Sequence, residues 1–297
     1  MTNSGVHGLG TIRRLWQLLE PVHAVVYFAP ESYEEAGTLG YATDDRWPLY
    51  FAYRAAPLGP VGPELVGSLF YSFAPRMVQR YAAHTWRTAD PARVLAARAT
   101  ATDRTLRRVF GERTTSADLA EAARLARRAA EAAAPAGRPL AAANSALPWP
   151  EAPHAALWHA ATILREHRGD GHLIALQAHH LDPVESLVLQ AGVGAVPAGA
   201  FESRQWTAQD WSAARERLVT RDLLDGDGAA TDAGLALRTA VEKLTDELAA
   251  APWTALTPPE AARLAELLLP LALDIVGADL LPTQSTLGIG MKYDYQD

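Results

Sequence analysis

Signals for helix starts recur along the whole 297-residue chain, and they constrain its fold more than any other feature. Thr257-Pro-Pro-Glu260 has the spacing of a capping box with proline at the first helical position, and Asp182-Pro-Val-Glu185 repeats this arrangement. Alternation of apolar and polar residues with a period of two, which is typical of a half-buried strand, is almost absent. The sequence therefore predicts a mainly helical fold.

The predicted helices follow from apolar residues at helical spacing and from the residues that begin and end helices. Pro21 interrupts the first of them, as a kink or as a fresh start, because proline removes a backbone donor. Ser116 precedes an alanine- and arginine-rich run that is a strong helix former, and Pro135 ends that run. The predicted ranges are 10–29, 62–72, 90–111, 116–134, 151–168, 171–180, 182–192, 208–223, 232–250 and 258–276.

Two proline-rich stretches, 135–139 and 147–150, bracket a connector, and this connector is the predicted domain boundary. We expect an N-terminal helical domain over residues 1–147 and a second domain over residues 148–277. Residues 278–297 turn polar and glycine-containing, and they are expected to wrap the surface as a tail.

Composition excludes several classes of chemistry. The chain has no cysteine, so disulfides, thiolate nucleophiles, zinc–thiolate sites and iron–sulfur clusters are ruled out. Residues 1–10 lack the apolar region of an export signal, and no stretch approaches the roughly 20 apolar residues that span a bilayer. A cytoplasmic protein without a membrane partner is the expectation. The net charge of −7 repels phosphate polyanions unless basic residues gather on one face.

Residues 182–250 have the order of parts of a winged helix. A helix begins at Asp182, and Thr207-Ala-Gln-Asp210 caps a second helix. Asp225-Gly-Asp-Gly228 then forms a tight turn, and Thr231-Asp-Ala-Gly234 opens a long helix. This order resembles the MarR-type winged helix. We therefore expect an N-terminal helical domain packed on a C-terminal MarR-like winged-helix domain.

This winged helix is poorly equipped to bind DNA. The wing carries Asp225 and Asp227 and no basic residue, whereas phosphate contacts supply most nonspecific affinity. A scaffold or interaction surface is favoured, nucleic acid is an unlikely partner, and operator binding is the alternative. The basic residues of the recognition helix, Arg215, Arg217 and Arg221, are offset by Asp210, Glu216 and Asp222.

The densest polar cluster is the segment 166–172, which is predicted to join a helix ending near Arg168 to one beginning near Gly171. An imidazole beside a carboxylate is the usual equipment for acid–base catalysis. The candidate catalytic residues here are His167, Asp170 and His172. The alternative is a structural turn, in which Asp170 caps the next helix and the neighbouring arginines form salt bridges.

The first predicted helix presents His23, Tyr27 and Glu31 at spacings of four, so they share one face. His23 is a fourth candidate catalytic residue. Because it lies among valines, a histidine satisfied within the core is the competing interpretation.

Aromatic residues are concentrated in the N-terminal half and indicate either a core or an aromatic pocket whose arginines orient an anionic or carbonyl-bearing ligand. No nucleotide, flavin or metalloprotease motif is present, and His179 and His180 point apart on a helix. No cofactor and no metal site are expected. The candidate substrate-binding residues are Tyr27, Tyr53, Arg54, Phe70, Tyr71, Trp158 and Arg165.

Five segments of the chain form a recognisable set, namely HAVVYFAPE at 23–31, RAAPLG at 54–59, FYSFAP at 70–75, EHRGDGH at 166–172 and the wing region 221–234. They resemble the SalK-like helix-turn-helix family of actinobacteria, and the resemblance runs over about residues 10–277. Members of that family often lie in natural-product gene clusters, so the resemblance implies a fold and a biosynthetic context, with no assigned activity.

Taken together, the sequence predicts a protein that binds or transforms a small natural-product intermediate. As an enzyme it would be a cofactor-independent acid–base catalyst of the cyclase, isomerase or hydrolase type. The alternatives are a ligand-responsive transcriptional regulator and a noncatalytic binding or resistance protein. A homodimer is compatible with the sequence.

Overall fold

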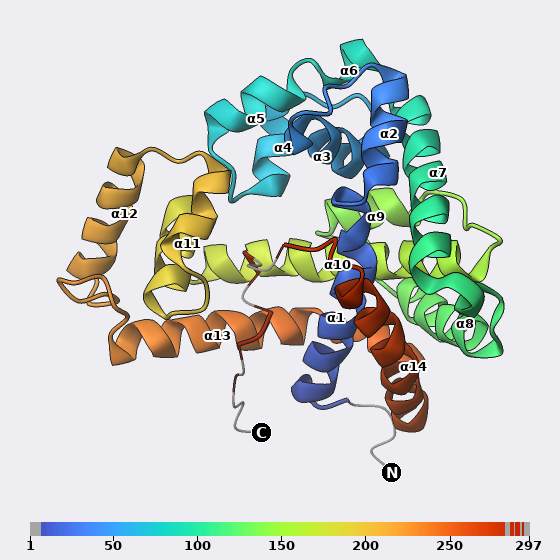
Figure 1. Ribbon diagram of the computed structural model, residues 1–297. Coiled ribbons are helices and arrows are strands. Elements are labelled where there is room, and N and C mark those ends of the chain that lie inside the picture. Colours follow the sequence, from blue (N-terminus) through green and yellow to red (C-terminus); the bar gives the residue numbers. More distant parts are fainter. Residues whose placement is uncertain (1–6, 283–285, 288, 292, 294–297) are drawn as a thin grey trace.

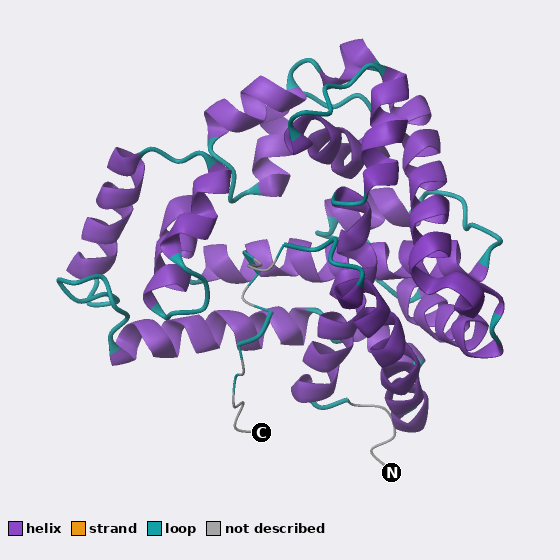
Figure 2. Ribbon diagram, viewed as in Figure 1, coloured by secondary structure: helices purple, strands orange, loops and turns teal. Residues whose placement is uncertain are grey.

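In the computed structural model, which describes residues 7–282, 286–287, 289–291 and 293, the chain is built from helices (Figures 1 and 2). The described residues contain no strand, and the one β-bridge joins Leu224 to Ala230. The mainly helical prediction is therefore confirmed. The α-helices are α1 (Leu9–Ala24), α2 (Pro30–Leu39), α3 (Arg46–Ala55), α4 (Pro63–Phe70), α5 (Pro75–Ala82), α6 (Thr85–Thr88), α7 (Pro91–Phe110), α8 (Ala117–Glu131), α9 (Pro139–Ser145), α10 (Pro153–Ala178), α11 (Pro183–Gly192), α12 (Ala208–Thr220), α13 (Asp232–Leu248) and α14 (Pro258–Gly277).

Short 3-10 helices connect several of these elements. They are η1 (Val25–Tyr27), η2 (Ala56–Leu58), η3 (Gly111–Thr115), η4 (Ala198–Arg204) and η5 (Ala251–Ala255). The predicted helix 10–29 is thus α1 followed by η1, and Pro21 lies inside α1. The sequence did not predict α2, α3, α5, α6 or α9, because helices of one to three turns show too little periodicity.

The segment 166–172 does not join two helices, so that prediction is wrong. It lies inside α10, which runs for 26 residues without a break. Helix interiors tolerate glycine at about 1 kcal/mol each relative to alanine. At Gly171 the missing side chain leaves room for Arg138, whose guanidinium would overlap a Cβ there. Burial of α10 among its neighbours outweighs the local preference of two glycines for a turn.

Helix α10 is the central element of the molecule (Figure 1). It packs against α7, α8 and α9 toward one end and against α13 toward the other, and α1 crosses it. The main core joins residues of α1, α7, α8, α10 and α14, and a second core lies under α3, α4 and α5. The domain boundary after residue 147 stays a prediction.

Helices α11, α12 and α13 form a unit at one end of α10 (Figure 1). Capping boxes at Asp182 and Thr207 begin the first two helices, and the Thr231 hydroxyl accepts the backbone N–H of Gly234 at the start of the third. The turn 225–228 between α12 and α13, which we call the wing turn because the sequence predicts a wing there, is held by Asp225, whose carboxylate accepts the backbone N–H of Asp227 and Ala229, each at 2.9 Å.

Candidate ligand-binding site

A cavity of about 670 Å³ lies between the end of α1, one face of α3, α10 and η4, and we call it the main cavity. A smaller chamber of about 150 Å³ adjoins it toward α11 and α13 and shares several of its wall residues. Residues of the C-terminal segment, Thr286 and Leu287, line both, so this part of the expected surface tail forms cavity wall. The main cavity is lined by Glu20, Pro21, His23, Ala24, Tyr27, Phe28, Arg46, Tyr50, Arg54, Arg165, Ala200, Ser203, Arg204, Val276, Asp279, Leu281, Pro282, Thr286, Leu287 and Ile289.

A buried ion cluster forms one wall of both chambers. Arg54 binds Glu166 through two parallel hydrogen bonds, from Nε at 2.9 Å and from Nη2 at 3.0 Å. Arg165 donates to the same carboxylate at 2.8 Å and lies 3.6 Å from Glu20. Burial alone would raise the pKa of Glu166, but Arg165 and Arg54 together hold it well below its ordinary value. Glu166 is therefore ionised and is the carboxylate that Arg54 and Arg165 share.

A second buried ion network joins the smaller chamber to α13. Arg168 and Arg13 each contact both Glu242 and Asp246 at 2.8–3.2 Å, and Arg238 contacts Glu242 at 2.7 Å. The positive charge that α10 directs toward α13, that of Arg168, is thus paired with the carboxylates of Glu242 and Asp246 on α13.

His172 lines the smaller chamber beside this network. Its Nδ1 lies 2.9 Å from the hydroxyl of Thr245, and burial lowers the pKa of its imidazole to about 3. The ring is therefore neutral near pH 7.

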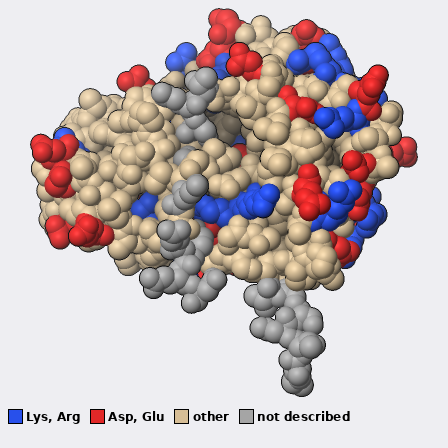
Figure 3. Space-filling model, turned by 60° about the horizontal axis from the view of Figure 1, so that its bottom comes forward, with Lys and Arg blue, Asp and Glu red and all other residues tan. Residues whose placement is uncertain are grey.

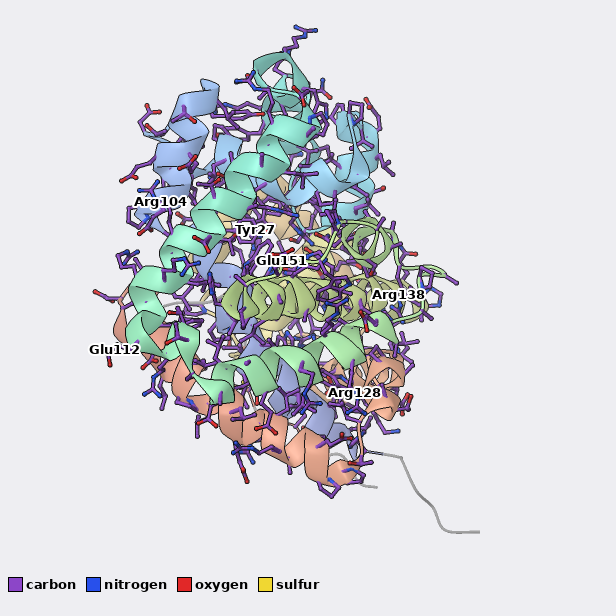
Figure 4. All side chains as sticks on the ribbon, turned by 90° about the vertical axis from the view of Figure 1, so that its right-hand side faces the viewer. Tyr27, Arg104, Glu112, Arg128, Arg138 and Glu151 are labelled. Carbon is purple, nitrogen blue, oxygen red and sulfur yellow. The ribbon has the colours of Figure 1, made fainter. Side chains whose placement is uncertain are left out.

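His23 and Tyr27 lie together in the main cavity, with ring centroids 5.3 Å apart. His23 Nδ1 is 3.0 Å from the hydroxyl of Thr162. Burial, followed by the charge of Arg165, holds the pKa of His23 well below its ordinary value, so the imidazole is neutral near pH 7. Burial also raises the pKa of Tyr27, which keeps its phenol protonated. Figure 4 shows Tyr27 in the interior of the molecule, whereas Arg104 and Glu112 lie toward its edge.

The predicted site residues divide into two sets. His23, Tyr27, Arg54 and Arg165 line the main cavity, and Phe70, Tyr71 and His172 line the smaller chamber with Arg54 and Arg165. The structure therefore brings seven of them together around two adjoining chambers that share wall residues. The others, His167, Asp170, Tyr53 and Trp158, line neither chamber.

Each residue of the second set has a structural contact. Trp158 donates to the backbone carbonyl of His23 at 3.2 Å, and the hydroxyl of Tyr53 reaches the carbonyl of Ser32 at 3.4 Å. His167 is buried next to Trp253, against a gap of about 10 Å³.

Several polar wall residues of the main cavity were not predicted, and Arg46, Tyr50 and Arg204 are three of them. Tyr50 lies one helical turn before Arg54 on α3, and this spacing is the one sequence feature that could have indicated its place in the site. Its hydroxyl accepts a hydrogen bond from Arg54 at 3.2 Å. Arg204 comes from η4, a segment without helical periodicity, so no pattern could have placed it.

Asp170 caps a helix, but not the one expected. Its carboxylate accepts the backbone N–H of Leu140 at 3.0 Å and of Ala141 at 3.1 Å, and so caps α9 from the middle of α10. Its second oxygen is buried without a hydrogen-bond partner, and burial raises the pKa of Asp170 to about 6.

Replacement of Asp170 with asparagine is expected to raise the free energy of unfolding at pH 7–8 by ~2 kcal/mol. A raised carboxyl pKa means that the folded state binds the proton more tightly, so this group disfavours folding as the pH rises from about 4 through about 6. Asparagine keeps an acceptor for α9 and does not ionise. Urea unfolding at several pH values tests this, with the exposed Asp44→Asn as control. If Asp170→Asn instead lowers the free energy of unfolding at pH 7, the prediction is wrong, and the backbone N–H groups of Leu140 and Ala141 stabilise the ionised carboxylate more than burial destabilises it.

The wing turn and α12 are bound to their own unit. The wing pairs with the end of α11, where the carbonyl of Gly192 accepts the backbone N–H of Ala230 at 2.9 Å. Arg215 of α12 donates to the carbonyl of Gly226 in the wing turn. Helix, helix, turn and helix thus close into one unit with its own core of α10, α11, α12 and α13 residues.

A family model described as a helix-turn-helix family matches residues 12–282. The chain belongs to this helix-turn-helix family. No curated protein and no solved structure matches the chain. In the described part of the chain, no helix is long and apolar enough to cross a membrane, and no three His, Cys, Asp or Glu side chains are grouped to hold a metal ion.

In this helix-turn-helix protein, the arginines of α12 and Arg221, which directly follows it, are engaged within the unit. Arg217 contacts Asp182 and Glu185, and Arg221 contacts Glu185 at 3.3 Å. Figure 3 shows acidic side chains gathered at the end of the molecule that carries α12 and the wing, where Asp225 and Asp227 are exposed. This surface presents little uncompensated positive charge to a phosphate backbone.

Proposed function

We propose that this protein binds a small molecule in the main cavity. The volume of about 670 Å³ lies within the range of ligand sites, roughly 300–1,000 Å³. The wall combines aromatic and aliphatic side chains with a few convergent polar groups, which is the usual composition of such sites. This cavity is the observation that carries the proposal.

The resemblance to the SalK-like proteins supports a natural-product intermediate as the ligand. If the cavity is also an active site, its chemistry is cofactor-independent acid–base catalysis, with the neutral imidazole of His23 as proton acceptor and the phenol of Tyr27 as donor. A noncatalytic binding or resistance protein would have the same cavity. Turnover of a candidate intermediate, lost in His23→Gln while binding persists, separates the two.

The neutral fluorescent probe N-phenyl-1-naphthylamine tests the cavity directly. We expect saturable fluorescence enhancement with the wild-type protein and a loss of affinity of at least about tenfold in Ala24→Trp, because the indole fills space beside His23. Ala120→Trp adds the same side chain on an exposed face of α8 and should bind the probe as the wild type does. Equal binding by both variants would contradict the proposal.

A ligand-responsive regulator is a second candidate, and one observation favours it. Arg204 in the cavity wall lies three residues before Thr207, which caps the recognition helix α12. A ligand that contacts Arg204 would therefore act close to the start of that helix. A MarR-like mode of DNA binding belongs to this candidate.

We nevertheless expect no specific duplex binding at physiological salt, because Arg217 and Arg221 are engaged in ion pairs, Arg215 is hydrogen-bonded to the turn, and the turn itself is acidic. Fluorescence anisotropy with DNA from upstream of the gene, with and without a cavity ligand, measures this. A Kd of about 10⁻⁸ M or tighter, typical of specific sites, would overturn the expectation and establish the regulator.

A further inference from the structure

We propose that the ligand of the main cavity carries an anionic head group, a carboxylate, phosphate or sulfonate, which binds between Arg46 and Arg204. This inference rests on the proposed ligand-binding function and adds the chemical class of the ligand. It is drawn from the charges of the cavity wall, from the fixed positions of the two guanidiniums and from the apolar surface beside them.

The cavity wall contains more positive than negative charge. Of its four arginines, Arg54 and Arg165 are neutralised by Glu166, with Glu20 close to Arg165. By contrast, within the part of the chain that the structure describes, Arg46 and Arg204 form no ion pair, and the Nε of each is buried without a hydrogen-bond partner. The carboxylate of Asp45, next to Arg46 in the chain, accepts a hydrogen bond from Tyr81 and acts on Arg46 only through its charge. The remaining wall carboxylate, Asp279, is exposed and contacts neither.

Both guanidiniums are held in place by aromatic rings, so an anion would meet them pre-positioned. Arg46 lies over Trp47 at 4.2 Å and over Phe28 at 4.8 Å. Arg204 lies over Phe73 at 4.3 Å and donates to the hydroxyl of Thr286 at 2.8 Å. A planar guanidinium fixed in this way loses little entropy when it binds an oxyanion with two hydrogen bonds.

Tyr50 lies near this site, with its ring centroid 6.0 Å from the guanidinium of Arg46, and the pKa of its phenol reflects the charge of Arg204 and of the paired arginines. Burial alone would raise the pKa of its phenol, but Arg54, Arg165 and Arg204 together lower it. The same excess of positive charge acts on Arg204, where burial and the neighbouring arginines lower the pKa to about 10. In a chain whose net charge is −7, half-buried arginines without counter-ions cost free energy that an anionic ligand would recover.

The rest of the wall indicates that the ligand is amphipathic. Phe28, Val276, Leu281 and Leu287 face the cavity on the side of α1 and the C-terminal segment. A simple inorganic anion would leave this apolar surface uncovered. An organic acid with an apolar or aromatic body fills both halves of the cavity.

A pair of probes isolates the head group. 8-Anilinonaphthalene-1-sulfonate is N-phenyl-1-naphthylamine with a sulfonate added, so the ratio of their affinities measures what the anion contributes. We expect the wild type to bind the sulfonate at least about tenfold more tightly, and Arg46→Gln and Arg204→Gln each to lose about tenfold toward the sulfonate. Both variants should keep their affinity for the neutral probe, which also shows that they are folded. The exposed Arg14→Gln removes one positive charge elsewhere on α1 and should change neither affinity.

If the wild type binds both probes with equal affinity, and Ala24→Trp still binds neither, the inference of an anionic head group is wrong. The proposed ligand-binding function would not be affected by this result. An equal loss in Arg14→Gln would overturn the anionic head group as well, because the effect would then be general electrostatics. Failure of either probe to bind in the cavity would reject the ligand-binding function and this inference together.

Discussion

Replacement of Glu166 with glutamine is expected to lower the free energy of unfolding by about 3–5 kcal/mol, because it removes one partner of a buried ion cluster. Arg54 and Arg165 would keep their charges in a site where the Glu166 side chain is 1% exposed and Arg54 is 9% exposed. Glutamine has nearly the same shape, so the loss comes from charge and not from packing. Urea or thermal unfolding at pH 7 measures it.

The matched control is Glu131→Gln, which removes a carboxylate from an exposed pair with Arg127 on α8. Exposed pairs contribute about 0–1 kcal/mol, so this variant should unfold close to the wild type. The pKa of Glu166 is held below its ordinary value, so its stabilisation is present above about pH 4–5 and is lost as the pH falls further. The gap between wild type and Glu166→Gln should therefore narrow in acid. A difference of less than 1 kcal/mol at pH 7 would contradict the assigned role.

The parts of the fold that sequence predicted are those fixed by contacts between near neighbours. The capping boxes at Asp182, Thr207 and Thr257 begin α11, α12 and α14 because each joins residues three positions apart. The prediction of a turn at the two glycines of segment 166–172 was wrong because it, too, used only near neighbours in the sequence. The glycines favour a turn locally, but the burial of α10 among its neighbours outweighs that preference, and Arg138 packs in the space that Gly171 leaves.

The candidate site was predicted in part. Arg54 and Arg165 stood out as cations among aromatics, and His23 and Tyr27 shared a helix face, so their place in the cavity follows from local pattern. Arg46 and Arg204, the pair proposed to bind the anionic head group, could not be identified from local sequence pattern. The two residues come from α3 and η4, and whether a guanidinium lacks a counter-ion depends on side chains that only the fold brings near.

Substitution of Gly234, just after the wing turn, tests a close contact between two backbone segments. Gly234 lies in the first turn of α13, where a Cβ would overlap the carbonyl oxygen of Leu223. The backbone of Gly234 is helical, and alanine is a better helix former than glycine by about 1 kcal/mol, so intrinsic propensity alone predicts a gain in stability. The close approach predicts the opposite, since a backbone carbonyl cannot rotate aside as a flexible side chain can.

We expect the steric term to win, and Gly234→Ala to lower the free energy of unfolding by about 3 kcal/mol, at the upper end of what overpacking costs. The strain would fall where Leu223 enters the wing and where the carbonyl of that residue accepts the backbone N–H of Thr231 at 3.2 Å. Hydrogen exchange should therefore show faster exchange in the wing and at the start of α13 than in α10. Gly226→Ala is the control within the same wing, because nothing lies within 4 Å of a Cβ at that position. If both variants unfold like the wild type, α13 can shift away from the wing, and the spacing of Thr231 and Gly234 is not set by this contact.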